Sequence, residues 1–412
     1  MKSVIHAGPR LAASEWHRLR MRAIFDFCKW DPQCEDHSVL ADFPLELSVD
    51  EFAKLSLLAE RLSLEALAAE REILTKPGLM ERLAIPKRIR RVLEQVESSE
   101  SKATDLRAMR FDFHYTSDGW RISEVNADVP GGYIEASGWN ALFAAEYTGT
   151  TMPPDAARKY VEAILRIAGE GSQVALAHAT VYSEDRQIMV YLAKLMTQRG
   201  LRACLVSPQH IYWEQGRARM KASFASEEGA VVVRLYPAEW IPSSAPREEW
   251  KFWFAGSQTP LSNPGCALVL QSKRFPLVWS ELRSDLSRWR EISPEAIAPE
   301  ELRGKEMDEW VLKPAFGRVG EDVGIRGVTA DDAYGAILRS MRKHPQDWAA
   351  QRRFQILPVE TEGGPMYPCI GVYTVGGKAA GLYGRVSRSP LIDHNALDAA
   401  VLLRENRKEQ TE

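Results

Sequence analysis

The spacing of apolar residues changes at about residue 109. Before it, apolar positions recur at helical intervals after a capping box of Ser48 and Glu51, on a face made by Phe52, Leu55, Leu58, Leu62 and Ala66. Pro77-Gly78 ends this helix, and a second, basic helix is expected from Pro86 to about Glu97. We therefore expect residues 1–108 to form a mostly helical N-terminal region.

From Met109 onward, apolar and polar residues alternate. Strands at 109–116 and 120–126 flank Ser117-Asp118-Gly119, which predicts a β-hairpin, and a helical stretch follows near 134–148. A linker pattern at 151–154 comes next.

Residues 155–240 alternate between helical and strand patterns, which is typical of a small α/β lobe with a parallel sheet. We expect helices at 155–168 and 185–199, and strands at 174–179, 201–206 and 231–237. Further along, the patterns predict helices near 273–289 and 330–343, and strands at 309–313, 323–327, 352–358, 367–375 and 379–387. The predicted fold class is α/β.

Composition narrows the class of protein. The 412 residues are 45% hydrophobic and 26% charged, as expected of a globular chain of two or three lobes. A net charge of −3 excludes a strongly basic nucleic-acid-binding surface over the whole chain. The N-terminus has no apolar leader core, no apolar run approaches the roughly 18 residues of a membrane helix, and the five cysteines are scattered. We expect a cytoplasmic protein without membrane or nucleic-acid partners.

The hairpin carries the first candidate chemistry. Alternation puts Arg110 and Asp112 on one face of the first strand, and Glu124 and Asn126 on one face of the second. A three-residue turn with Gly119 left-handed would pair Thr116 with Trp120 and bring all four side chains to the same face, whereas a two-residue turn would place Asp112 on the wrong face.

Facing carboxylates repel each other unless a cation lies between them. Magnesium prefers hard oxygen ligands, so Asp112, Glu124 and Asn126 form a candidate Mg²⁺ site. A surface hairpin whose acids pair with Arg110 and Arg121 is an equally good interpretation of this pattern alone.

A glycine-rich segment carries the second candidate site. The strand that ends at Lys313 is followed by Gly317, Arg318 and Gly320, a composition that lets backbone amides approach phosphate oxygens. Lys313 could then contact a nucleotide phosphate. The alternative is an ordinary hairpin loop. Downstream, Gln355-Ile356-Leu357 is a candidate adenine-side strand end, and Arg385 is a candidate anion clamp.

Several short motifs, in order from about residue 105 to 400, resemble the synthetase part of the glutathionylspermidine synthase family. They are Arg110-Phe-Asp112, Glu124-Val-Asn126-Ala-Asp128-Val-Pro130 with Glu135, Glu184-Asp185-Arg186, Arg234-Leu-Tyr-Pro-Ala-Glu-Trp240, Ser272-Lys273, Lys313-Pro-Ala-Phe-Gly317-Arg318-Val-Gly320, and Gly371-Val-Tyr with Gly384-Arg385. The resemblance implies an ATP-grasp architecture. In it, 109–150 would be the acidic hairpin and helix of the core, 151–260 the α/β lobe, and 261–412 the nucleotide-binding lobes with a glycine-rich flap.

The resemblance also implies a role for each matching residue. Asp112, Glu124 and Asn126 match magnesium ligands, and Lys273 and Lys313 match lysines on the ATP phosphates. Residues 315–321 match a phosphate-covering flap, Gln355, Ile356 and Leu357 an adenine-side segment, and Arg110 and Arg385 arginines that stabilise the transferred phosphoryl group. The sequence departs from the family pattern at Ser272, Val319 and Val129, and has no room for the amidase domain of bifunctional members.

The implied activity is an ATP- and Mg²⁺-dependent carboxylate–amine ligase that forms an amide through an acyl phosphate. The substrates would be a small carboxylate and an amine, which the resemblance suggests are a glutathione-like peptide and a polyamine. Two alternatives stay open, namely a small-molecule kinase on the same scaffold and a catalytically weak nucleotide-binding homologue. The oligomeric state is not indicated.

Overall fold

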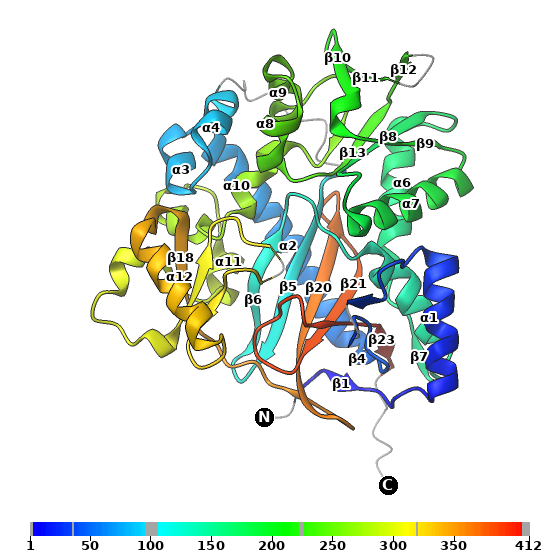
Figure 1. Cartoon of the computed structure of the whole chain (residues 1–412), viewed down its shortest axis with the longest axis vertical. Helices are drawn as coiled ribbons and strands as arrows, with labels where there is room; N and C mark the ends of the chain where they lie inside the picture. The colour runs from blue at the N-terminus through cyan, green and yellow to red at the C-terminus, as the bar shows by residue number, and fades with distance from the viewer. Residues whose placement is uncertain (1–2, 35–36, 95–105, 222–225, 319, 406–412) are drawn as a thin grey trace.

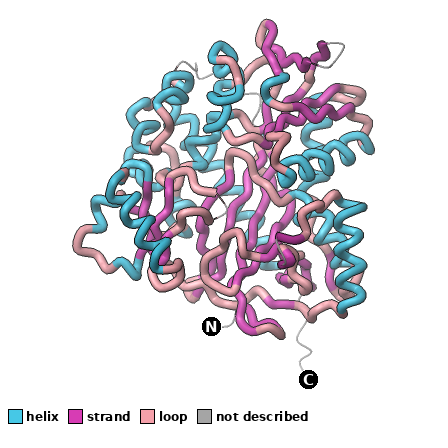
Figure 2. Tube along the Cα trace, in the orientation of Figure 1, coloured by secondary structure: helices cyan, strands magenta, loops and turns pink. Residues whose placement is uncertain are grey.

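A computed structural model describes residues 3–34, 37–94, 106–221, 226–318 and 320–405. It is a mixed α/β structure, as the sequence predicts, with helices packed around several separate sheets (Figures 1 and 2). Within the described part of the chain, no helix is both long enough and apolar enough to cross a membrane.

The central sheet contains the predicted acidic hairpin. Its strands run in the order β22-β21-β20-β5-β6, with β19 paired to β20. Their bounds are β5 (Ala108–Thr116), β6 (Gly119–Asn126), β19 (Val359–Thr361), β20 (Gly364–Val375), β21 (Lys378–Ser387) and β22 (Leu397–Ala399). All these pairings are antiparallel. Gly376 and Gly377, both with positive φ, form the turn that joins β20 to β21.

Helix α2 (Val49–Leu74) lies against β20 and β21 and covers one face of this sheet (Figure 1). Ser48 caps it as predicted, because its side chain accepts a hydrogen bond from the amide of Glu51 at 3.1 Å. Apolar residues of the helix and sheet share one core, which includes Leu55, Leu62, Phe111, Phe113, Ile370 and Val372. The opposite face of the sheet is left for polar residues.

The predicted parallel lobe is confirmed. Strands β14 (Leu261–Ser262), β13 (Val231–Leu235), β8 (Gln173–His178) and β9 (Arg202–Val206) form a parallel sheet in that order. Helices α6 (Ala156–Ala168) and α7 (Ser183–Gln198) pack against it at the upper right of Figure 1. An antiparallel sheet of β10 (Ile211–Glu214), β11 (Arg217–Lys221) and β12 (Ser226–Glu228), which the sequence analysis missed, adjoins this lobe.

A fourth sheet carries the strand that ends near Lys313. Its order is β15-β18-β16-β17, with β15 (Ala296–Ile297), β16 (Trp310–Pro314), β17 (Gly324–Ile325) and β18 (Trp348–Arg352). Helix α12 (Asp331–Lys343) packs on it over a separate core that includes Trp310, Leu312 and Ile337. The predicted strand at 352–358 is wrong, because the sheet strand ends at Arg352.

The N-terminal region is less helical than predicted. Besides α1 (Ala13–Phe27), α3 (Pro77–Arg82) and α4 (Lys87–Leu93), it supplies β1 (His6–Ala7) and β4 (Leu45–Ser48) to a sheet of order β1-β4-β23-β7, together with β7 (Thr150–Thr151) and β23 (Val401–Arg404). A short ribbon pairs β2 (Gln33–Cys34) with β3 (His37–Ser38). Strand β4 of this region therefore pairs in parallel with β23, the last strand described.

Two helical predictions need correction. The helix near 134–148 is a π-helical turn, η2 (Glu135–Trp139), followed by α5 (Asn140–Ala144). The single helix near 273–289 is wrong, since a 3-10 segment, η7 (Phe275–Glu281), stands between α10 (Leu268–Gln271) and α11 (Ser287–Ile292). Its aromatic residues pack on one another in an irregular turn, with Phe275, Trp279 and Trp289 in mutual contact. The remaining α-helices, α8 (Ile241–Ser244) and α9 (Trp250–Ala255), lie in the segment between β13 and β14.

Candidate active site

Asp112 and Glu124 lie opposite each other in the β5–β6 register, and Arg110 lies opposite Asn126. The predicted turn is nevertheless wrong. Thr116 pairs with Gly119, so only two residues close the hairpin. Gly119 is left-handed, as expected, with φ +88°. The cross-strand pairs survive because of a feature that the sequence analysis missed, a β-bulge on β6.

The bulge is at Ser123. Phe113 pairs with Ile122 while Asp112 pairs with Glu124, which leaves Ser123 as the extra residue. Its hydroxyl donates to the carbonyl oxygen of Asp112 at 3.2 Å and lies 3.2 Å from Nε2 of His114. The extra residue reverses the side of the sheet to which the following side chains point. It therefore corrects the register that a two-residue turn alone would give.

Asp112 is the most enclosed member of the predicted metal set. It is 7% exposed, so this acid is not an ordinary solvated surface residue. Arg110 donates from Nε and Nη2 to its two oxygens at 2.7 and 3.0 Å, and Asn126 donates at 2.9 Å. The neighbouring strand makes room for this pair, because a Cβ on Gly371 would lie 2.8 Å from Arg110 Cδ. Arg121, the other cation of the surface interpretation, instead donates to the carbonyl of Glu291.

Glu124 meets both predicted phosphate lysines. Its carboxylate is 2.8 Å from Nζ of Lys273, and Lys313 donates to the neighbouring carbonyl of Ser123 at 3.0 Å. Burial by itself raises the pKa of Glu124, but the two lysines outweigh burial and bring that pKa to about 2. Burial lowers the pKa of Lys313 to about 8. The bulge at Ser123 thus has two effects. It sets the register of β5 and β6, and its carbonyl accepts a hydrogen bond from Lys313.

A pocket opens between β6 and the β16–β18 sheet. Ser123, Glu124, Lys273 and Lys313 line one part of it, and apolar residues, including Leu270, Phe275 and Trp289, line another. A cavity with an apolar wall and a few convergent charges is the usual form of a small-molecule site. Lys273 and Lys313 are 40 positions apart in the sequence, and they share one pocket.

The predicted phosphoryl arginines occupy the same face of the central sheet. Gly371 pairs with Asp112 on one side and with Tyr383 on the other, and Arg385 lies two residues beyond Tyr383 on β21. The guanidinium of Arg110 lies 4.8 Å from the centre of the Tyr383 ring. Arg385 donates to the carbonyl of Asp393 at 2.6 Å. This face of the sheet thus carries both arginines as well as Asp112.

Two predicted segments lie elsewhere. Gln355, Ile356 and Leu357 run beside the hairpin turn, where the amide of Leu357 donates to Tyr115 at 2.9 Å, and none of the three lines the lysine pocket. On the glycine-rich loop, Arg318 pairs with Glu239 at 2.6 Å and lies 5.5 Å from the Trp240 ring. Gly317 and Gly320 pack closely against Pro314 and Ile392. Val319 lies outside the described residues.

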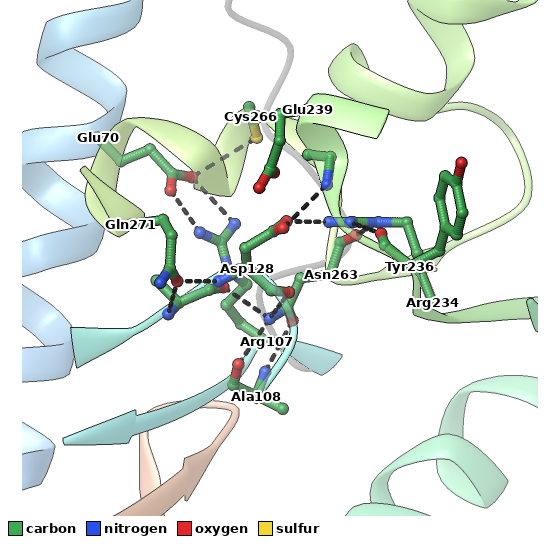
Figure 3. A network of polar contacts seen from close by, with 12 residues as sticks. Glu70, Arg107, Ala108, Asp128, Arg234, Tyr236, Glu239, Asn263, Cys266 and Gln271 are labelled. Atoms are coloured by element: carbon green, nitrogen blue, oxygen red, sulfur yellow. Dashed lines mark hydrogen bonds and ion pairs between the residues drawn. The ribbon is translucent and has the colours of Figure 1, made fainter. Parts of the chain in front are cut away.

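A buried network, which the sequence analysis missed, fixes the base of the hairpin (Figure 3). Asn263 bonds both the amide and the carbonyl of Ala108, at 2.9 and 2.6 Å. Gln271 accepts hydrogen bonds from the amides of Ala127 and Asp128. Because Lys273 follows Gln271 by two residues, the same contacts fix the distance from Lys273 to β6.

Asp128 and Arg234 form a second part of this network. Both are buried, their side chains are paired, and Asp128 also accepts from the amide of Ala238 at 2.9 Å (Figure 3). Asp128 and Arg234 both occur in the sequence motifs noted above, but the sequence analysis assigned no role to either. Their pairing connects the end of β6 to the turn that carries Glu239 and Trp240.

The donor set is chemically suited to a hard cation. Two carboxylates and one amide face each other across a bulged hairpin, which is a ligand set that magnesium accepts. No cluster of three or more His, Cys, Asp or Glu side chains able to bind a metal occurs within residues 3–34, 37–94, 106–221, 226–318 and 320–405. The set depends on Asn126 as its third ligand. Arg110, Lys273 and Lys313 outnumber the two acids, which leaves the site with one excess positive charge.

A family model, a curated relative and a solved structure match this chain. Residues 13–399 match the family model described as "Glutathionylspermidine synthase preATP-grasp". A Haemophilus influenzae protein described as "Putative acid--amine ligase" is 21% identical over 286 residues, which is 66% of this chain and 68% of that protein. A crystal structure from Methylobacillus flagellatus, titled as a "Putative gamma-glutamylcysteine synthetase", is 14% identical. The match covers 78% of this chain and 86% of that one, with a TM-score of 0.41.

The family match spans nearly the whole described chain, from α1 to β22. The chain therefore belongs to the glutathionylspermidine synthase preATP-grasp family.

Proposed function

We propose that this protein is an ATP- and Mg²⁺-dependent carboxylate–amine ligase of ATP-grasp type, which makes an amide through an acyl phosphate and has no amidase activity. Membership of the family and the acid–amine ligase relative support the reaction class. The observation that carries the proposal is the convergence of Lys273 and Lys313 on Glu124 in one pocket, beside Asp112 and Asn126.

In this proposal, Lys273 and Lys313 hold the ATP phosphates in the pocket between β6 and the β16–β18 sheet. The apolar wall of the pocket would lie against the base. Asp112, Glu124 and Asn126 would hold magnesium, which when bound offsets the charge of the phosphates. The excess positive charge of the site suits a polyanionic reactant.

Arg110 and Arg385 would orient the reacting groups. Arg110 is fixed by both Asp112 oxygens and by the carbonyl of Gly131 at 2.8 Å, so its guanidinium is held before substrate arrives. Such preorganised charge lowers the barrier for phosphoryl transfer mainly through positioning and electrostatic stabilisation. The carboxylate substrate would attack the γ-phosphate, and the amine would then displace phosphate from the acyl phosphate.

The test is a screen for ADP release over pairs of small carboxylates and amines, in which mass spectrometry identifies the product. The proposal expects ADP formation that requires both partners and yields an amide. ADP formation with a carboxylate or alcohol alone, with a stable phosphorylated product, would identify a kinase instead. Binding of Mg·ATP without turnover over a broad panel would identify a catalytically weak homologue. Glutathione-like peptides and polyamines are the first pairs to try.

A further inference from the structure

Lys29, in the loop after α1, has a buried ammonium group that the proposed reaction does not use. Its side chain is 5% exposed and its Nζ lies 3.0 Å from Asp31, 2.5 Å from Glu135 and 3.4 Å from Asp398. Burial alone would lower the pKa of Lys29, but these carboxylates outweigh burial and raise that pKa well above its ordinary value. The group is therefore a permanent positive charge among acids from three separate parts of the chain.

The loop that carries Lys29 is held firmly. Cys28 ends α1 in the left-handed conformation, with φ 63°, and the amide of Lys29 donates back to the helix at 2.9 Å. Gln187 on α7 accepts from the amide of Trp30 at 2.7 Å and donates to Asp31 at 2.6 Å. The N-terminal region thereby inserts a charged loop beside the central sheet at a defined position.

One of the three acids connects Lys29 to the candidate site. Asp398 on β22 pairs in register with Arg385 on β21. Its Oδ2 faces Lys29, while its Oδ1 accepts from the hydroxyl of Tyr383 at 2.6 Å. Nε of Arg385 is 3.9 Å from the same Oδ1, too far for a hydrogen bond, and this buried Nε has no hydrogen-bond partner among the described residues.

We propose that Lys29 is a positioning residue. By sharing the charge of Asp398, it prevents that carboxylate from drawing Arg385 into a close ion pair, so Arg385 keeps part of its guanidinium for an anionic reactant. The inference rests on the proposed function, because it gives Arg385 a phosphoryl or carboxyl group to bind. It also assigns a role in the site to the N-terminal region, for which the sequence motifs indicated none.

A purely structural role makes a different prediction. If Lys29 only balanced buried acids, Glu135 would matter most, since it is the nearest carboxylate at 2.5 Å. Removal of Glu135 would then compensate for loss of Lys29 at least as well as removal of Asp398. If Lys29 acts on Arg385, only removal of the negative charge of Asp398 compensates, because Asp398 is the acid that reaches Arg385.

The experiment compares Lys29→Met with two charge-compensated double variants, Lys29→Met/Asp398→Asn and Lys29→Met/Glu135→Gln. Each double variant restores the charge balance that the single substitution removes, which also guards against a folding failure. Lys29→Arg tests rescue by a conservative change. Lys54→Met, which removes an exposed lysine paired to Glu51, is the matched control.

Lys29→Met should lower kcat by about 10²-fold while KM for ATP stays unchanged, because the loss is one of orientation. Lys29→Arg and Lys29→Met/Asp398→Asn should recover most of this loss, and Lys29→Met/Glu135→Gln should not. Equal recovery by the two double variants, or full activity in Lys29→Met, would overturn the proposal.

A second readout is independent of turnover. In crystal structures of the wild type and Lys29→Met, the Nε–Oδ1 separation of Arg385 and Asp398 should close from 3.9 Å to a hydrogen-bonding distance of about 2.9 Å in the variant. An unchanged separation refutes the role of Lys29 even if no substrate pair is found. A closed separation in a protein without ligase activity would support the positioning role and reject the proposed function alone.

Discussion

Lys313 donates a hydrogen bond to the backbone carbonyl of Ser123, the residue that forms the bulge in β6. The contact joins the sheet that carries the glycine-rich loop to the sheet that carries the acidic hairpin. A single extra residue thereby restores the pairing of Asp112 with Glu124 and also anchors the lysine that faces them.

Removal of the charge of either pocket lysine should weaken ATP binding, although the two lysines contact different partners. Lys273→Met breaks an ion pair and leaves Glu124 partly uncompensated, whereas Lys313→Met removes a hydrogen bond to a neutral carbonyl. Both substitutions should weaken ATP binding, and by our proposal each should raise the Kd for Mg·ATP by at least about tenfold, or 1.4 kcal/mol. Titration calorimetry measures this. Lys305→Met, at an exposed lysine outside the pocket, should leave the Kd unchanged.

Gly119→Ala tests the turn of the hairpin. No atom lies within 4 Å of the added Cβ, so the only cost is the left-handed backbone at φ +88°. We expect a loss of about 1 kcal/mol in the free energy of unfolding. Gly78→Ala is the matched control, because Gly78 has equally open space without a positive φ, and it should be neutral or slightly stabilising. Urea unfolding followed by circular dichroism compares them, and equal effects would argue against a left-handed Gly119.

Arg234→Met should be strongly destabilising. It leaves Asp128 buried without its charge partner, which costs about 3–5 kcal/mol. Arg217→Met removes an ion pair in which both side chains are more than a third exposed, and should cost under about 1 kcal/mol. The midpoint of thermal unfolding distinguishes them. Similar small losses for both variants would mean that the buried network of Figure 3 does not hold the base of the hairpin.

Glu72 should make stability depend on pH in the acid range. A hydrogen bond from Lys76, opposed by burial and aided by the amides of Arg283 and Ser284, lowers the pKa of Glu72 to about 2. A lowered pKa stabilises the fold above the unfolded-state pKa of about 4.5, and this contribution is lost as pH falls toward 2.

The stability difference between wild type and Glu72→Gln isolates this group. It should be constant from pH 7 to about 5 and then shrink toward about pH 2. A difference that stays the same from pH 7 to 3 would contradict the assignment.

The sequence predicted the regular parts of the fold well, because local patterning controls them. The spacing of apolar residues identifies the alternating helices and strands of the parallel lobe. Ser48 caps α2 through a contact with Glu51, only three residues away. The segment at 273–289 was mispredicted because its apolar aromatic residues satisfy a helical period while they pack as a 3-10 turn. Similarly, Phe354, Ile356 and Leu357 suggested that the strand continues to 358, but β18 ends at Arg352.

The candidate site was predicted through its residues and not through its geometry. The sequence analysis paired Asp112 with Glu124 correctly, but it did so by assuming a three-residue turn. Nothing in the residue types at 119–126 distinguishes a bulge at Ser123 from a longer loop. Lys29, Asn263 and Gln271 were missed because each has a partner more than 100 residues away in sequence, namely Glu135, Ala108 and Ala127. Long-range polar contacts of this kind leave no periodic signal in the chain.

The most direct test of the proposed Mg·ATP site is titration calorimetry of ATP into wild type and Asp112→Ala, each with and without magnesium. Our account predicts that wild type binds ATP tightly only with magnesium, and that Asp112→Ala binds weakly and equally under both conditions. Binding that keeps its full dependence on magnesium in Asp112→Ala would contradict the assignment of the hairpin as the metal site.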